Sequence, residues 1–178
     1  NLQRTSDYFT VLHLNARSIL HKRDHIEHLM QIINVNIDII AVSETWETDI
    51  NSDLIKIPGY NKCSKHRLNN ETGGGVALFI HNSIEYSAIN SVTKTFESVF
   101  VEFKTRHKGP TIIGAIYRPP GGSLIDFNEE YDCLLTNFTR NNNKNIILAG
   151  DYNSNLLNHN LHEATESFLN IMYSHKML

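Results

Sequence analysis

The sequence contains little cysteine and no long apolar run. Its 178 residues include only two cysteines, Cys63 and Cys133, which is too few for a disulfide framework, so a reduced intracellular setting is expected. The longest apolar candidates, Ile37 to Val42 and Val76 to Ile80, are strand-sized and far short of the roughly 20 residues that cross a bilayer. The first residues also lack the apolar segment of a secretory signal. We therefore expect no membrane partner.

An excess of positive charge is also absent. Lys and Arg number 16 against 19 Asp and Glu, which gives a formal net charge of −3. This balance argues mildly against a nucleic-acid partner, although an enzyme can offset it with a bound divalent cation and a local basic surface. The apolar fraction of 40% and the charged fraction of 20% are those of an ordinary globular domain. Composition therefore excludes wholesale disorder and leaves function open.

The first part of the chain has the pattern of a strand, a helix and a second strand. Tyr8 to Asn15 reads as a strand, and Ser18 is expected to cap the following helix. The apolar residues of that helix recur at a spacing of about 3.6 residues. Ile37 to Glu44 is almost continuously apolar, which predicts a strand covered on both faces.

The rest of the chain predicts short strands and then two helices around another strand. The helices are expected over Ser123 to Arg140 and Leu161 to Met172, with a short buried strand over Asn145 to Ala149. The earlier strands carry turn residues between them and are expected to pair antiparallel; they are Tyr60–Lys65, Gly75–His81, Ile84–Ile89, Ser98–Lys104 and Thr111–Arg118. This order predicts an α/β fold, a four-layer sandwich of two packed mixed or antiparallel sheets flanked by helices.

Polar residues that directly follow apolar strands are the candidates for chemistry, because a strand end fixes a side chain at the rim of a sheet. They are Asn15, Glu44, Tyr117 with Arg118, Asp151 and Asn153. Each alone has a simpler interpretation, such as a solvated carboxylate, an Asx turn or a strand terminator. Together they indicate a site, because the strand ends of one sheet tend to converge.

Five motifs that contain these residues follow one another in order. They are Leu14-Asn15-Ala16-Arg17, Ser43-Glu44-Thr45-Trp46, Gly73-Gly74-Gly75-Val76-Ala77, Tyr117-Arg118-Pro119-Pro120 and Gly150-Asp151-Tyr152-Asn153. This series resembles the endonuclease/exonuclease/phosphatase superfamily over essentially the whole chain. The Glu-Thr-Trp and Tyr-Arg-Pro-Pro variants look most like the apurinic/apyrimidinic-like endonuclease domain of non-LTR retrotransposons.

The resemblance implies a metal site and roles for the strand-end residues. Asn15 and Glu44 correspond to the family's metal-site residues, and oxygen ligands suit Mg²⁺, with Mn²⁺ as an alternative. Asp151 would orient or deprotonate the attacking water, and Asn153 would hold that water or the phosphate. Tyr117 would contact the scissile phosphate and stabilise its charge. Arg118 is expected, with Tyr117 and Asn153, to bind the substrate.

The resemblance also contains a departure. The family closes with a downstream Asp and a Ser-Asp-His or similar motif, and nothing after Asn153 matches either. The interpretation is a single domain over residues 1–178 that is incomplete at its C-terminus, with the last strands missing and very low activity. Turnover comparable to that of a complete homologue, in a plasmid-nicking assay with Mg²⁺, would contradict this interpretation.

The implied function is an endonuclease that nicks double-stranded DNA and leaves 3′-hydroxyl and 5′-phosphate ends. In a retrotransposon the nick would prime reverse transcription, so a reverse transcriptase domain in the same polyprotein and a nuclear location are expected. The alternatives are a phosphatase of the same fold and a non-catalytic remnant that binds DNA or a partner. Lys65 and Arg67 are further candidates for phosphate contacts, and Trp46 either stacks on a base or sugar or packs behind Glu44.

Overall fold

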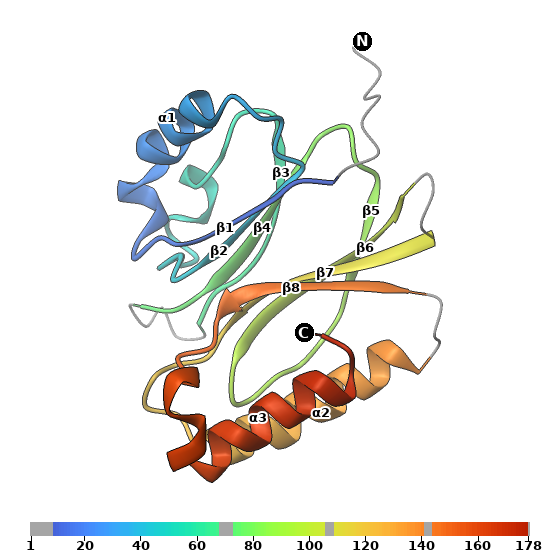
Figure 1. Cartoon of the computed structure of the whole chain (residues 1–178). Coiled ribbons are helices and arrows are strands. Elements are labelled where there is room, and N and C mark those ends of the chain that lie inside the picture. Colours follow the sequence, from blue (N-terminus) through green and yellow to red (C-terminus); the bar gives the residue numbers. More distant parts are fainter. Residues whose placement is uncertain (1–8, 68–72, 106–108, 141–143, 178) are drawn as a thin grey trace.

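Two four-stranded sheets stacked on each other form the centre of the molecule (Figure 1). The structure is a computed structural model that describes residues 9–67, 73–105, 109–140 and 144–177. The first sheet has the order β1-β2-β4-β3, with β1 and β2 parallel and the other neighbours antiparallel. Its strands are β1 (Val11–Asn15), β2 (Ile39–Ser43), β3 (Tyr60–Lys65) and β4 (Val76–His81).

The second sheet has the order β5-β6-β7-β8. The pairs β5–β6 and β6–β7 are antiparallel, whereas β7 and β8 are parallel because α2 connects them. Its strands are β5 (Tyr86–Ile89), β6 (Glu97–Thr105), β7 (Gly109–Tyr117) and β8 (Asn145–Asp151). The antiparallel pairing predicted for the middle of the chain is confirmed.

Helices cover the outer face of each sheet (Figure 1). Helix α1 (Arg23–Ile33) lies outside the first sheet, and α2 (Leu124–Thr139) and α3 (Glu163–Ser174) lie outside the second. Three short 3₁₀ turns complete the described elements; they are η1 (Ile19–His21), η2 (Ser52–Leu54) and η4 (Leu156–Leu161). The four layers are those of the predicted α/β sandwich.

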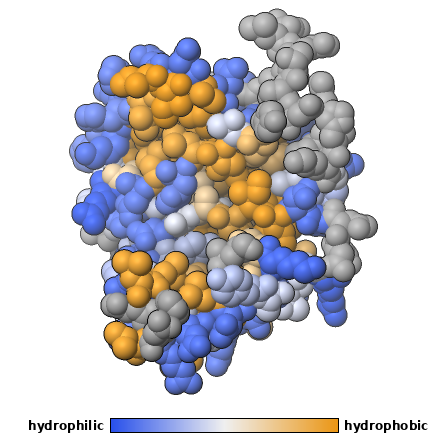
Figure 2. All heavy atoms as spheres, in the orientation of Figure 1, coloured by the Kyte–Doolittle hydropathy of each residue, from blue (hydrophilic) through white to orange (hydrophobic). Residues whose placement is uncertain are grey.

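The strands β1 and β8 form edges of the two sheets and lie next to each other. Figure 2 shows apolar atoms gathered on the face that carries both strands. The prediction that Asn145 to Ala149 is a buried strand is wrong in this respect, because the side chains of β8 are partly exposed. An apolar strand sequence indicates that the faces of the strand are covered by other layers, but it does not tell whether the strand has a neighbour on both sides in its sheet. The predicted absence of further strands stays a prediction.

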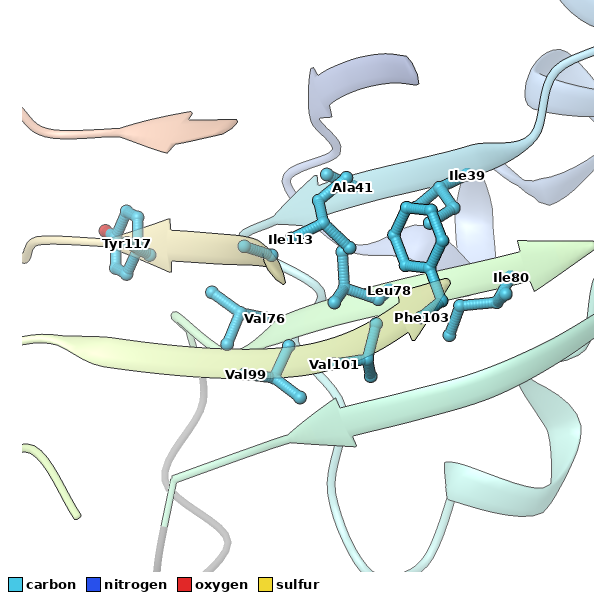
Figure 3. Close-up of a cluster of buried hydrophobic side chains, with 11 residues drawn as sticks. Ile39, Ala41, Val76, Leu78, Ile80, Val99, Val101, Phe103, Ile113 and Tyr117 are labelled. Carbon is cyan, nitrogen blue, oxygen red and sulfur yellow. The ribbon is translucent and has the colours of Figure 1, made fainter. Parts of the chain in front are cut away.

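Apolar side chains fill each space between the layers. The cluster between the sheets includes Leu78, Val101 and Ile113, and Tyr117 lies at one end of it (Figure 3). A second cluster around Phe79 packs between the first sheet and α1, and a third around Phe127 packs between the second sheet and its helices. β2 is buried over its whole length, as its continuous apolar sequence predicts. This packing holds the strand ends in fixed positions.

The predicted capping role of Ser18 is wrong. Ser18 precedes the 3₁₀ turn η1, makes no side-chain capping bond and has a φ of 81°, and α1 begins only at Arg23. Ser123 does cap α2, since its hydroxyl accepts from the Asp126 amide at 3.2 Å. In the described part of the chain no helix is long and apolar enough to span a membrane.

Candidate active site

Three predicted site residues meet where the two sheets come together. The Asn15 side-chain amide Nδ2 lies 2.8 Å from Glu44 Oε1 and 2.8 Å from Asp151 Oδ2 and donates to both. Asn15 ends β1 and Glu44 follows β2, both in the first sheet, whereas Asp151 ends β8 in the second. The structure therefore brings together residues that lie up to 136 positions apart in the sequence.

Backbone hydrogen bonds hold Asn15 beside Glu44. After the parallel β1–β2 pairing ends, Ala16 donates to the Ser43 carbonyl at 2.9 Å, and Ser18 donates to the Glu44 carbonyl at 3.0 Å. Ile19 then donates to the Thr45 carbonyl at 3.0 Å. The segment that follows β1 is thus bonded to the segment that follows β2. This arrangement explains why Ser18 serves the site loop rather than the start of α1.

The side chains of the corner Asp151–Asn153 point alternately toward the site and toward the core. Asp151 faces Asn15, while the Tyr152 ring packs into the third cluster, with its centroid 5.4 Å from that of Phe168. Asn153 is exposed again, its amide N–H donates to Asp151 Oδ1 at 3.1 Å, and its side chain donates to the Arg118 carbonyl at 2.7 Å. The partly buried Tyr152 therefore anchors the corner, while Asp151 and Asn153 on either side of it face away from the third cluster.

Gly150 is required by the pairing that delivers Asp151. A methyl group at this position would overlap the backbone of Ile116, its partner on β7, and a backbone carbonyl cannot move aside as a side chain can. We expect Gly150→Ala to destabilise the protein by about 1–3 kcal/mol, measured by urea unfolding. Gly121→Ala is the matched control, because nothing lies within 4 Å of a methyl there. Equal stability of both variants would contradict the expectation.

Left-handed backbone conformations cluster at this site. Among the described residues other than glycine, seven have positive φ, and five of these lie in the site loops; they are Arg17, Ser18, Glu44, Trp46 and Asn153. Such conformations cost energy for residues with a side chain and persist where surrounding bonds enforce them. Their concentration marks the site independently of the motifs that predicted it.

Tyr117 ends β7 beside the three converging residues. Its ring belongs to the cluster between the sheets, and the residue is 6% exposed. Burial, and next the negative charge of Glu44, raise the pKa of the Tyr117 phenol, while Arg67 opposes the shift. The hydroxyl therefore stays protonated at neutral pH and can donate a hydrogen bond to an anion.

The structure adds Glu97, which the sequence analysis missed. Glu97 begins β6 opposite Tyr117 and accepts the Arg67 Nε–H at 2.6 Å and the Gly75 amide N–H. The Gly75 carbonyl in turn accepts the Thr45 amide at 3.2 Å, directly after Glu44. Glu97 thus ties the second sheet to the Glu44 loop. Only the strand register, which the sequence does not reveal, places it there.

If Glu44 holds a divalent cation, we expect Glu97→Gln to weaken binding of that cation about 10- to 100-fold, the usual cost of losing a group that supports a metal ligand. The physical reason is that Arg67 loses its ion pair and the Gly75 amide loses an anionic acceptor, which loosens the Glu44 loop. Mn²⁺ titration followed by electron paramagnetic resonance measures the effect. Glu102→Gln is the control, because Glu102 lies on the same strand and is also ion-paired, with Lys144 at 2.5 Å.

Lys65 and Arg67, the further candidates for phosphate contacts, bond within the protein, whereas Trp46 is exposed. Arg67 is paired with Glu97, and Lys65 Nζ lies 3.5 Å from the Ser91 carbonyl, so both cations have partners within the protein. Trp46 is 41% exposed, while its backbone is held by an N–H donated to Gly74 at 2.9 Å. The exposed Trp46 ring agrees better with the stacking alternative than with packing behind Glu44.

Arg118 does not lie at the rim, where a substrate contact was expected. It is 4% exposed, and its guanidinium donates to the carbonyls of Tyr152 at 2.7 Å, Gly122 at 2.8 Å and Asn153 at 2.5 Å. A longer contact of 3.4 Å reaches the Pro119 carbonyl. Burial lowers the pKa of Arg118, and the charge of Asp151 opposes this shift. The apolar strand before Arg118 and the loops around it bury the side chain, so its hydrogen bonds go to backbone groups.

The donor set suits a hard divalent cation. In the described residues no three His, Cys, Asp or Glu side chains are grouped to hold a metal. Glu44 and Asp151 nevertheless accept from one nitrogen, so two carboxylates lie close together with an amide between them. Mg²⁺ takes one or two protein carboxylates and keeps several waters. Nearby, burial lowers the pKa of His13 and Asp151 opposes the shift, so a neutral imidazole lies behind the site.

The fold is an α/β sandwich of two stacked mixed sheets with outer helices, and carboxylate and amide side chains meet at one end of the strands. Solved nucleases and phosphatases have this fold. The chain belongs to the Endonuclease/Exonuclease/phosphatase family, whose sequence pattern matches residues 12–170. A search of curated proteins found no match.

Several solved structures share this fold at low sequence identity. The endonuclease domain of TRAS1, a telomere-specific non-LTR retrotransposon, superposes with a TM-score of 0.69 at 12% identity, covering 94% of this chain and 71% of that one. An AP endonuclease from Leishmania major gives 0.69 at 15%, covering 97% and 70%. A mannosyl-6-phosphatase from Bacteroides thetaiotaomicron gives 0.67 at 16%, covering 92% and 70%. The fold is therefore common to nucleases and phosphatases.

Proposed function

We propose that the chain is a Mg²⁺-dependent phosphodiesterase that nicks double-stranded DNA, with Mn²⁺ able to replace Mg²⁺. The observation that carries the proposal is the convergence of Glu44 and Asp151 on the Asn15 amide, at 2.8 Å each. Two carboxylates held together cost energy unless a cation or proton compensates them. A partly exposed pair of carboxylates such as Glu44 and Asp151 is better explained by a cation-dependent reaction than by stability.

Glu44 and the side-chain oxygen of Asn15 would hold the metal ion. When bound, the ion neutralises phosphate oxygens and the leaving 3′-oxygen. The structure offers support for these ligands in the backbone bonds from Ser18 and Thr45, which fix the Glu44 loop from both sides. Precise positioning of this kind is what a metal site requires.

The remaining residues would handle water and phosphate. Asp151 would take a proton from a water molecule as the water oxygen attacks phosphorus. The bond between phosphorus and the 3′-oxygen would break, a proton from solvent would pass to that oxygen, and the ends would be a 3′-hydroxyl and a 5′-phosphate. Asn153 would hold the water or the phosphate, and the protonated Tyr117 hydroxyl would donate to a phosphate oxygen as charge develops.

The exposed Trp46 favours a nucleic acid as the substrate. It lies two residues from Glu44, and its carbonyl accepts the Asn51 side chain at 3.3 Å, so the backbone is held while the residue is 41% exposed. Aromatic rings stack on bases and sugars without regard to sequence. We propose that the nick primes reverse transcription in a non-LTR retrotransposon, with a reverse transcriptase domain in the same polyprotein and nuclear DNA as the target.

The test combines metal binding with nicking. Mn²⁺ titration of the chain measures the site without any need for turnover, and conversion of supercoiled plasmid to the open circle with Mg²⁺ measures the reaction. We expect one divalent ion per chain and slow, EDTA-sensitive nicking. Hydrolysis of a sugar phosphate without nicking would favour the phosphatase alternative. Plasmid binding without a metal site would favour the non-catalytic remnant.

A further inference from the structure

Arg118 connects three segments next to the site: the end of β7, the corner after β8 and the loop before α2. It follows β7, and its guanidinium donates to the carbonyls of Tyr152 and Asn153 in the corner after β8, and to that of Gly122 before α2. The Arg118 amide also donates to the Asp151 carbonyl at 2.9 Å, and its carbonyl accepts the Asn153 side chain. The backbone and the side chain of one residue therefore bond to every residue of the corner Asp151–Asn153.

The surroundings of Arg118 leave little freedom to its side chain. The residue is 4% exposed, and its guanidinium carbon lies 5.8 Å from the centre of the Phe127 ring, within reach of a cation–π contact. Nε, Nη1 and Nη2 all donate to carbonyl oxygens, which is a use of the planar fork that a lysine ammonium cannot reproduce. An arginine that bound substrate phosphate would need these donors free.

We propose that Arg118 is a positioning residue that holds the backbone of the Asp151–Asn153 corner and so sets the place of Asp151 relative to Asn15 and Glu44. This inference rests on the proposed function only for its effect on activity. The hydrogen bonds from Arg118 to the backbone of the corner are present whether or not the protein is an enzyme. Asn153 has a φ of 46°, a left-handed conformation that needs support, and the two carbonyls that flank this residue's φ and ψ bonds accept from Arg118.

The test uses Arg118→Lys and Arg118→Gln, with Arg140→Lys as the control because Arg140 is exposed at the end of α2. Hydrogen exchange of backbone amides reports on the backbone of the corner without any activity. We expect the Asn153 amide, which donates to Asp151 Oδ1, to exchange about tenfold faster or more in both variants, with the α1 amides unchanged. Arg140→Lys should leave the Asn153 amide as it is.

A second measurement separates positioning from substrate binding. If Arg118 positions the corner, Arg118→Lys lowers kcat for nicking about 10- to 100-fold with little change in KM; a rise in KM alone would overturn the proposal in favour of phosphate binding. Unchanged exchange at Asn153 in a folded variant, or global unfolding of both variants, would also overturn it. Faster exchange in a chain that neither binds metal nor nicks DNA would support the positioning role of Arg118 while the proposed function fails.

Discussion

Replacing Glu44 with glutamine is expected to lower the rate of metal-dependent nicking strongly while the fold is retained. The replacement keeps the shape of the side chain and an oxygen that can accept the Asn15 amide, so the 2.8 Å bond can persist. What is lost is the negative charge that a divalent cation requires. A metal ion contributes several kcal/mol to stabilising the transition state, and each 1.36 kcal/mol is a factor of ten in rate. We therefore expect a loss on the order of 10³-fold.

The measurement for Glu44→Gln pairs Mn²⁺ titration with plasmid nicking. Asp53→Asn serves as the control, because Asp53 is an exposed carboxylate in η2, away from the strand ends. In EDTA the variant should melt at the same temperature as the parent or higher, since removing one of two close carboxylates relieves repulsion. A lower melting temperature would mean that Glu44 has a structural role, and unchanged Mn²⁺ affinity would remove it from the metal site.

Asp151→Asn is expected to give the second large loss. A general base contributes about 10²- to 10⁴-fold to a rate, and an amide cannot accept the proton from the attacking water. The substitution keeps an oxygen for the Asn153 amide N–H, whose bond to Oδ1 is 3.1 Å, but its NH₂ group cannot accept from the Asn15 side chain as Oδ2 does. Rates measured in single-turnover nicking at saturating Mg²⁺ isolate the proton transfer from metal binding.

A Mg²⁺ titration distinguishes a base from a simple ligand. If Asp151 takes the proton, the nicking rate of the Asp151→Asn variant stays low at every Mg²⁺ concentration. If Asp151 serves only as a metal ligand, higher Mg²⁺ restores the rate of the variant. Recovery of the parental rate at high Mg²⁺ would therefore contradict the assignment of Asp151 as the base.

The sequence predicted the fold because most of its strands have unambiguous patterns. β2 is buried over its full length, as Ile39–Ser43 indicates, and β3 spans Tyr60–Lys65 as expected. The buried strand predicted at Asn145–Ala149 is instead the partly exposed edge strand β8, since burial depends on how distant segments pair. Ser18 was misjudged because its backbone bonds to Glu44, a partner that local capping rules do not consider.

Part of the site was predictable because its residues directly follow strands with clear apolar patterns. Asn15, Glu44, Tyr117 and Asp151 follow apolar strands, and a parallel pair such as β1–β2 brings its ends to the same edge. Glu97 was missed because its place follows from the antiparallel register opposite Tyr117. Arg118 was assigned to the substrate because a cation beside a strand end usually points to solvent, whereas here carbonyl groups of two loops surround it.

The edge positions of β1 and β8 have a consequence for how the site comes apart. Backbone hydrogen bonds at a sheet edge open at a lower free energy than those of central strands such as β6 and β7. Asn15 ends one edge strand and Asp151 ends the other, so local opening of either strand separates the two side chains while the core between the sheets stays intact. Within the described part of the chain we therefore expect Asn15 and Asp151 to separate by local fraying before global unfolding, so that hydrogen exchange at β1 and β8 would report on the edges rather than on global stability.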